Sequence, residues 1–166
     1  VDDEVNAGSA SVLDNIGALS VSAWIYPKDM TNKYIVTKNE FGGTNGWQFN
    51  FSSSGDCSNT AQRLRFSVDY VTSDVIRCST TNAIPFNTWS HVVVTWDGST
   101  DATGVHIYRN GIEVVYAQTV NGSGARRDDS TRDLVIGNDG NGGATAFNGL
   151  IDDVRVYNRA LSTDEI

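Results

Sequence analysis

The stretch Phe147–Ile166, FNGLIDDVRVYNRALSTDEI, combines a turn, a strand and the start of a helical turn. Asn148-Gly149 is a turn dipeptide, and Leu150–Tyr157 then has the apolar content of a strand. Ser162, followed three residues later by Glu165, matches the pattern of a capping box, so we expect the chain to enter a helical turn at its end. We also expect the natural protein to continue beyond this turn.

An acidic pair, Asp152-Asp153, interrupts the predicted strand. Ile151 lies on one side of the pair and Val154 and Val156 on the other. In a regular strand, side chains alternate between the two faces, so Ile151 would face one way and both valines the other. Two adjacent carboxylates inside a strand are costly unless something neutralises them. The pair is therefore a candidate for binding a cation.

The rest of the chain also has the pattern of an all-β protein. Short runs of alternating apolar and polar residues are separated by Gly, Asn, Asp and Ser. The predicted strands cover residues 4–6, 19–26, 34–38, 46–52, 63–70, 75–78, 89–97, 104–109, 112–120, 133–137 and 150–157. Asn110-Gly111 is the strongest hairpin signal, because a type I′ turn needs positive φ at both central residues. Strands without crossover helices bury one face each most economically as two antiparallel sheets packed into a β-sandwich.

Three segments resemble the laminin-G-like domains of the concanavalin A-like lectin/glucanase superfamily. Residues 149–166 match, nearly throughout, a closing strand of the form G-x-I-D-[DE]-V-R-[IV]-Y-N-R-A-L-S-x-x-E-I. LSVSAWIYPK at 19–28 with IVTK at 35–38, and TWSHVVVTWDG at 88–98 with VHIYRNG at 105–111, match in the same order. The resemblance covers essentially the whole chain. It implies one domain over residues 1–166 with a jelly-roll sandwich, and commonly a bound calcium ion and a glycan or protein ligand.

Composition excludes several classes of partner. The net charge of -8 and the lack of a basic cluster, apart from Arg126-Arg127, argue against nucleic acid and anionic membrane surfaces. No apolar run approaches the roughly 18 to 20 residues of a membrane span. The chain carries no signal-peptide pattern and opens in mid-motif, so we expect a domain excised from a larger secreted or cell-surface protein.

Cys57 and Cys78 are the two cysteines of the chain. They flank a strand-turn-strand segment, which predicts a disulfide closing a loop of roughly twenty residues and stabilising the fold by about 3 kcal/mol. The alternative, two free buried thiols, is disfavoured because Cys57 lies in a polar Ser/Gly/Asp/Asn run. A disulfide indicates an oxidising, extracellular compartment.

Side-chain alternation sorts each strand into a core face and an outer face. The predicted core residues are Trp47, Phe49, Phe51, Leu64, Phe66, Val68, Val92, Val94, Trp96, Val105 and Ile107. The outer faces receive the polar and planar groups Gln48, Asn50, Arg65, Asp69, His91 and Tyr108. Amides, carboxylates and guanidinium groups beside a ring can hold a hydroxyl-rich sugar. The alternative is that each simply solvates the open side of an antiparallel sheet.

The tryptophans divide into two groups. Trp24, Trp89 and Trp96 match family positions that belong to the core. Trp47, Tyr34 and Tyr70 are then the candidate platforms on which a sugar ring could stack.

The acidic groups at the two ends of the chain suggest a calcium ion. In the family pattern the first strand carries an acidic pair, here Asp2-Asp3, and lies beside the last strand, where Asp152 can meet it. Ca²⁺ takes six to eight oxygen ligands with flexible geometry, and the absence of a Cys or His cluster argues against zinc. The resemblance thus implies a structural calcium held by Asp152 with Asp3 or Asp2.

Two alternatives to that calcium site stay open. The acidic edge could hold no ion, or an ion could bind in the loop that contains Asn138, Asp139 and Asn141. This loop does not follow the EF-hand pattern, because Leu150 stands where a glutamate is required.

Catalysis is not predicted. Retaining glycosidases need two carboxylates about 5 Å apart, and the glutamates Glu4, Glu40, Glu113 and Glu165 form no alternating acidic set. The histidines have no nucleophile-elbow motif nearby. We expect a carbohydrate-binding module that tethers a secreted protein to an oligo- or polysaccharide. The alternative is an adhesion or spacer domain with a protein partner.

Overall fold

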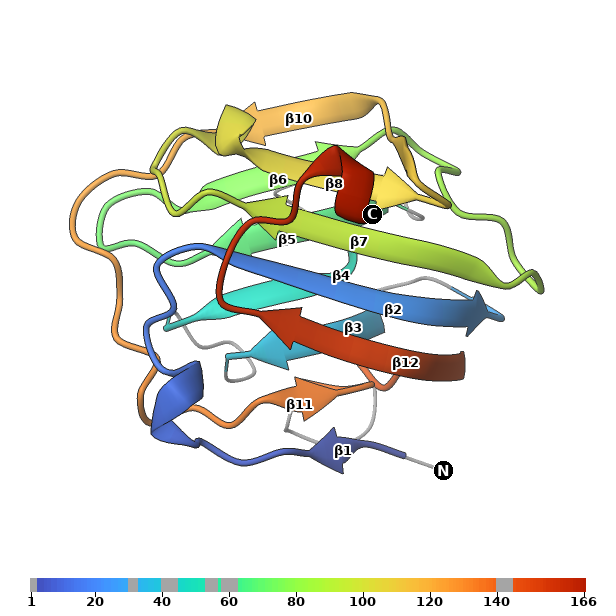
Figure 1. Cartoon of the computed structure of the whole chain (residues 1–166), viewed down its shortest axis with the longest axis horizontal. Helices are drawn as coiled ribbons and strands as arrows, with labels where there is room; N and C mark the ends of the chain where they lie inside the picture. The colour runs from blue at the N-terminus through green and yellow to red at the C-terminus, as the bar shows by residue number, and fades with distance from the viewer. Residues whose placement is uncertain (1–2, 30–32, 40–44, 53–56, 58–62, 140–144) are drawn as a thin grey trace.

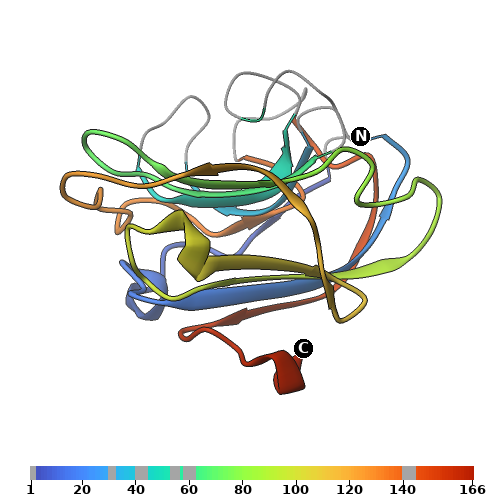
Figure 2. The ribbon, with the colours of Figure 1, turned by 90° about the horizontal axis from the view of Figure 1, so that it is seen from above.

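The computed structural model describes residues 3–29, 33–39, 45–52, 57, 63–139 and 145–166. Its strands form two antiparallel sheets packed face to face, which confirms the predicted β-sandwich (Figures 1 and 2). The large sheet has the order β1 (Val5–Asn6), β11 (Val135–Ile136), β3 (Lys33–Lys38), β4 (Trp47–Ser52), β5 (Arg63–Val68), β6 (Val75–Ser79) and β10 (Tyr116–Val120). The small sheet has the order β12 (Gly149–Tyr157), β2 (Leu19–Pro27), β7 (Ser90–Trp96), β8 (Val105–Arg109) and β9 (Ile112–Glu113).

Helical structure is limited, in the described residues, to single 3₁₀ turns. These are η1 (Ser11–Leu13), η3 (Ala102–Gly104) and η4 (Thr163–Glu165). No helix of the described chain is long and apolar enough to cross a membrane.

The core lies between the two sheets and contains every residue that the alternation assigned to it. Trp47, Phe49 and Phe51 of β4 face Val68, Phe66 and Leu64 of β5 in register, and all are buried. Trp96 of the small sheet meets Phe66 of the large sheet, with ring centroids 6.4 Å apart. These cross-sheet contacts hold the two layers together.

One predicted strand is two. Residues 112–120 contain β9, in the small sheet, and β10, in the large sheet, so the chain changes sheets between them. Val114 packs against the core while Val115 is exposed. Residues 112–120 contain no Gly, Pro, Asn, Asp or Ser, so no turn signal in the sequence marks this crossing.

The two apolar phases of β12 are joined by a β-bulge. Asp152 pairs with Trp24 and Arg155 with Ser22, so β12 has one more residue than β2 over this span. Asp153 has φ 47°, a left-handed conformation that Asp tolerates better than most residues. The extra residue lets Ile151, Val154 and Val156 all pack against the core. Both carboxylates are exposed, so solvent lowers the cost that we expected of the pair.

The tryptophan assignments are partly wrong. Trp96 is buried as predicted, but Trp24 and Trp89 are 42% and 41% exposed. Trp24 lies on the outer face of β2 because its neighbours Ala23 and Ile25 point into the core. Trp47 is 1% exposed, so it is a core residue and no stacking platform.

Three local predictions are confirmed. Asn110 and Gly111 both have positive φ in the turn between β8 and β9. Ser162 and Glu165 form a capping box at η4. Cys57 and Cys78 form a disulfide. The segment before η4 is fixed to the outer side of the small sheet (Figure 2), where the Ser20 hydroxyl donates to Arg159 O and accepts from Leu161 N–H.

Candidate functional site

The structure divides the predicted ligand-binding residues between the two outer faces of the sandwich. Gln48 and Asn50 of β4, Arg65 of β5 and Asp69, just after β5, lie on the outer face of the large sheet. His91 of β7 and Tyr108 of β8 lie on the outer face of the small sheet. The first group is brought together, and the second group belongs to the opposite side of the molecule.

Two cross-strand rows organise the outer face of the large sheet. One row runs through Tyr34, Asn50, Arg65, Cys78 and Gln118. The next row runs through Thr37, Gln48, Ser67, Ile76 and Val120. Because neighbouring strands are about 4.8 Å apart, the row from Tyr34 to Cys78 spans roughly 14 Å, the length of a few sugar rings.

We call the central part of these rows the polar face: Tyr34, Thr37, Gln48, Asn50, Arg65, Ser67 and Asp69. Next to it, Cys57, Ile76 and Cys78 form a small apolar cluster with Val120 packed against it. The arrangement places hydrogen-bonding groups beside an apolar surface. A pyranose has the same two properties, hydroxyl groups at its edge and C–H groups on its faces.

Most of the polar face is buried. Asn50, Arg65 and Asp69 are 4%, 7% and 4% exposed, whereas Gln48 and Tyr34 are half-buried. These groups therefore do not simply solvate an open sheet, which was the alternative interpretation of the sequence. Arg65 Nη1 donates to Gln48 Oε1 over 3.3 Å, and Asn39 Nδ2 donates to Asp69 Oδ2 over 2.7 Å.

Asn50 Oδ1 and Ser67 Oγ are buried on this face without a hydrogen-bond partner among the described residues. They lie in neighbouring rows on adjacent strands. Leaving a buried donor or acceptor unsatisfied costs about 1 to 3 kcal/mol. A ligand or water that supplies the missing hydrogen bonds would recover that cost.

Asp69 has an unusual protonation equilibrium. Burial raises the pKa of its carboxyl to about 7; the nearby Asp74 adds to the rise, and the Asn39 hydrogen bond and the Arg65 charge oppose it. Near neutral pH the carboxyl is therefore divided between its two forms and can donate or accept a hydrogen bond. Burial, followed by the charge of Asp139, also raises the pKa of Tyr34.

Asp69→Asn should flatten the pH dependence of stability between pH 5 and 8. Because the folded-state pKa is raised, Asp69 contributes stability that is complete below pH 4 and is lost as the pH rises through about 7. The loss amounts to at most about 1.4 kcal/mol for each pH unit in that window. Melting temperatures of both proteins at several pH values measure it.

The control is Asp128→Asn. Asp128 is exposed and its hydrogen bonds from Asn15 and Ser130 lower its pKa to about 2, so it does not titrate between pH 5 and 8. Equal pH slopes for the wild type and Asp69→Asn would show that Asp69 is ionised throughout this range.

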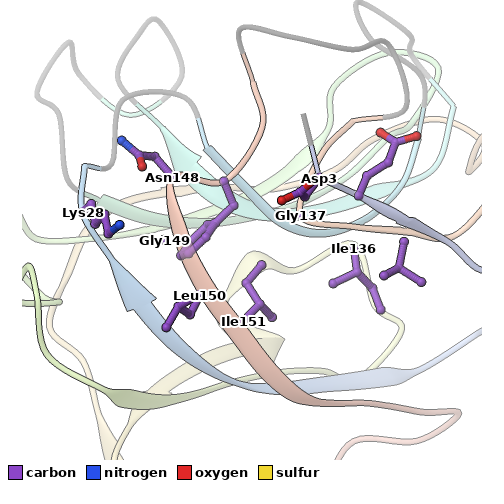
Figure 3. A pocket seen from close by; sticks show the side chains of 11 residues that line it. Asp3, Lys28, Ile136, Gly137, Asn148, Gly149, Leu150 and Ile151 are labelled. Atoms are coloured by element: carbon purple, nitrogen blue, oxygen red, sulfur yellow. The ribbon is translucent and has the colours of Figure 1, made fainter. Parts of the chain in front are cut away.

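The predicted calcium ligands do not come together in the described residues. A cleft of about 470 Å³ opens at the edge of the sandwich where β1 and β12 lie, and Asp3 lines it together with Ile136, Gly137, Asn148 and Ile151 (Figure 3). Asp152 is not among the described lining residues. The side chain of the preceding residue, Ile151, packs toward the core. Asp152 therefore lies on the outer face, in a row with Trp24.

The strand arrangement explains this separation. β1 pairs with β11 in the large sheet, and β12 pairs with β2 in the small sheet. The two strands share an edge of the sandwich without being neighbours in one sheet (Figure 1). Asp2 lies outside the described residues, and within them no group of three or more His, Cys, Asp or Glu side chains is placed to hold a metal ion.

The alternative loop site contains a polar network that includes Glu4. Thr145 Oγ1 lies 2.9 Å from Asn138 Oδ1 and 2.8 Å from Asp139 Oδ1. Asn138 Nδ2 donates to Glu4 Oε2 over 2.8 Å. Asn141 is outside the described residues. The network connects β1 to the segment after β11, a role that the sequence did not suggest for Glu4.

Sequence reasoning assigned no role to Ser67 or Asn39. Ser67 follows from the same alternation that identified Arg65 and Asp69, so its position was predictable although its role was not. Asn39 lies after the end of β3, and only the three-dimensional arrangement shows that it contacts Asp69.

Solved structures share this fold at low sequence identity. A protein from Bacteroides ovatus is 19% identical, with a TM-score of 0.67, over 98% of this chain and 43% of its own. The CBM40 of a Ruminococcus gnavus sialidase, bound to alpha2,3 sialyllactose, is 13% identical, with a TM-score of 0.62, over 90% of this chain and 80% of its own. Domain 4 of an extracellular arabinanase from Geobacillus stearothermophilus, in complex with arabinotriose, is 19% identical, with a TM-score of 0.53. The match covers 90% of this chain and 64% of the arabinanase domain.

These identities show the fold alone. The chain spans less than two thirds of the Bacteroides protein and of the arabinanase domain. No curated protein matches it. A family profile with the description concanavalin A-like lectin/glucanases superfamily matches residues 1–166. The chain therefore belongs to this laminin-G family of concanavalin A-like domains.

Proposed function

We propose that this chain is a non-catalytic carbohydrate-binding module that holds an oligo- or polysaccharide on the polar face of its large sheet. The observation that carries the proposal is the pair of buried atoms Asn50 Oδ1 and Ser67 Oγ, unpartnered in the described chain and adjacent to Gln48 and Arg65. Buried polar groups are normally paired. A sugar hydroxyl can both donate and accept, so it can pair with each of these groups.

The comparisons support a glycan as the ligand class. The related fold of the Ruminococcus gnavus sialidase module binds sialyllactose, and that of the Geobacillus arabinanase domain binds arabinotriose. Function depends on the site rather than on the fold. The support is therefore that this fold can present a sugar site, and the polar face supplies the groups.

The positions of the glutamates favour binding over hydrolysis. None of the described glutamates lies on the polar face. Glu4 lies at the edge near β1, Glu113 of β9 pairs with His106 of β8, and Glu165 caps η4. Glu40 is outside the described residues. The proposal includes no reaction step.

The wider role is a tether in a larger secreted protein. The disulfide supports an oxidising compartment. An alternative function, adhesion to a protein, is favoured by the exposed Trp24 and Trp89 on the outer face of the small sheet. Exposed tryptophans are common at protein interfaces.

A structural calcium bound by Asp152 with Asp3 or Asp2 stays a prediction. The described residues do not fit it well: Asp152 Oδ1 already accepts from the Asp153 N–H over 2.8 Å, and Asp152 lies apart from the cleft that Asp3 lines. The binding experiment below is therefore run with calcium and with a chelator. Loss of binding or of melting temperature in chelator would support the ion.

A glycan and polysaccharide screen of the folded chain tests the proposed function, followed by titration of the best hit against variants. Gln48→Ala and Asn50→Ala should each weaken binding about tenfold, because each removes one hydrogen bond to the sugar. The matched controls are His91→Ala, half-buried like Gln48, and Tyr108→Phe, both on the opposite outer face, and these should bind like the wild type.

The outcome can contradict the proposal in two ways. Unchanged affinity in Gln48→Ala and Asn50→Ala, with folding verified by melting, would remove the polar face as the site. Loss of binding in His91→Ala or Tyr108→Phe would move the site to the small sheet.

A further inference from the structure

We infer that the glycan held by the polar face is neutral, without carboxylate, sulfate or phosphate groups. This inference rests on the proposed function and adds the ligand class. The fold leaves the class open, because one related structure holds sialyllactose, an acidic glycan, and another holds arabinotriose, a neutral one.

The charges at the centre of the polar face are mixed. Tyr34 and Arg65 lie in one cross-strand row, and Asp69 follows four residues after Arg65 on the same outer face. The charges of Arg65, Asp69 and Asp139 all act on the pKa of Tyr34. Asp69 in turn interacts with Arg65, Arg127 and Asp74. Both signs are represented, and each arginine has a carboxylate nearby.

An anionic sugar needs a cation whose charge is available to it. Arg65 is 7% exposed, contacts Gln48 and lies within electrostatic range of Asp69. Asp69 is also buried, and Asn39 holds it in place. An anion that approached Arg65 would therefore enter a poorly solvated site that it shares with Asp69, and the ionised form of this carboxyl would repel it.

Neutral hydroxyl groups suit the same atoms. Gln48 and Asn50 carry amides, Ser67 a hydroxyl, and Asp69 a carboxyl that is divided between its two protonation states near neutral pH. These groups donate and accept hydrogen bonds without requiring a charge on the ligand. The net charge of -8 on the whole chain adds a weaker, long-range repulsion against acidic polymers.

The experiment compares matched neutral and acidic glycans on the intact chain. The best hit of the screen is titrated beside a derivative in which C6 hydroxymethyl groups are oxidised to carboxylates, and lactose is titrated beside sialyllactose. We expect the acidic member to bind at least roughly tenfold more weakly. Asp69→Asn should reduce that ratio severalfold, because it removes the carboxylate that lies on the same strand face as Arg65 while keeping a side chain of the same shape.

Each result has a distinct meaning. Equal or tighter binding of the acidic member would overturn the neutral-glycan inference and leave the proposed function in place. An unchanged ratio in Asp69→Asn would overturn the assignment of Asp69 as its cause. If the folded chain bound no glycan at all, the proposed function itself would fail, and the inference with it.

Discussion

Asp129→Ala is expected to lower the free energy of unfolding by about 3 to 5 kcal/mol, because it removes a fully buried carboxylate that helps to compensate two cations, Lys38 and Arg126. Lys38 is fully buried, on the core side of β3 opposite Trp47. Its Nζ donates to Arg132 O over 2.6 Å and to Asp129 O over 2.9 Å, and it lies 3.1 Å from Asp14 Oδ1 and 3.9 Å from Asp129 Oδ1.

The Asp129 carboxylate also connects other parts of this end of the sandwich. It accepts from Asn15 N–H over 2.7 Å and from Arg126 Nη2 over 3.0 Å. Asp129 itself is fully buried. Its removal therefore leaves both Lys38 and Arg126 less compensated, and surrounding water cannot replace the lost carboxylate without opening the core.

Thermal and denaturant unfolding measure the effect. For a chain of this size, a loss of 3 to 5 kcal/mol corresponds to a fall in melting temperature of roughly 6 to 20 °C. Asp128→Ala is the control, because the neighbouring carboxylate is exposed and its removal should lower the melting temperature far less.

A second variant tests the cause. Adding Lys38→Met to Asp129→Ala removes the uncompensated charge, so part of the stability should return. Equal losses in Asp128→Ala and Asp129→Ala, or no recovery in the double variant, would show that the buried charge is not the reason.

The sequence predicted Lys38 as a strand residue but gave it no role. Its hydrogen-bond acceptors, Arg132 O and Asp129 O, are 94 and 91 positions away along the chain. Asp128-Asp129 directly follows Arg126-Arg127 in the sequence, and this local charge pattern gives no reason to pair either carboxylate with Lys38. Local patterns show that a strand forms, whereas the partners of a buried charge depend on which loops cover the end of the sheet.

The polar face was predicted to a similar extent. Alternation correctly placed Gln48, Asn50, Arg65 and Asp69 on the outer side of their strands. It could not place His91 and Tyr108 relative to them, because alternation distinguishes inside from outside within a strand but does not say to which sheet the strand belongs. Sheet membership is fixed by pairing between distant segments.

β12 shows the same limit at the level of a single residue. Its two apolar phases were visible in the sequence, and a bulge at Asp153 is the structural reason for them. Trp24 is a different case: β2 alternates regularly, and the outward position of Trp24 between Ala23 and Ile25 was available from the sequence. The resemblance to family core positions gave the wrong assignment there.

Removal of the disulfide should have the second large effect. Cys57 and Cys78 are separated by 21 positions, and closing a loop of this length stabilises a fold by about 3 kcal/mol, through the reduced entropy of the unfolded chain. Cys57→Ala with Cys78→Ala should therefore lower the melting temperature by roughly 6 to 12 °C. Reduction of the wild type with dithiothreitol should produce a similar fall and should not affect the double variant.

The position of the bridge predicts what reduction does to binding. Cys78 follows Arg65 in the cross-strand row of the polar face, and Cys57 packs beside it in the apolar cluster with Ile76. The unpaired Cys78 would still occupy its place on β6, because the strand pairing of β5 with β6 does not depend on the bridge. We therefore expect a folded, reduced chain to keep Gln48 and Asn50 in place and to bind the glycan more weakly mainly through looser packing of the cluster. Complete loss of binding below the melting temperature would instead make Cys57 and its bridge part of the contact surface itself.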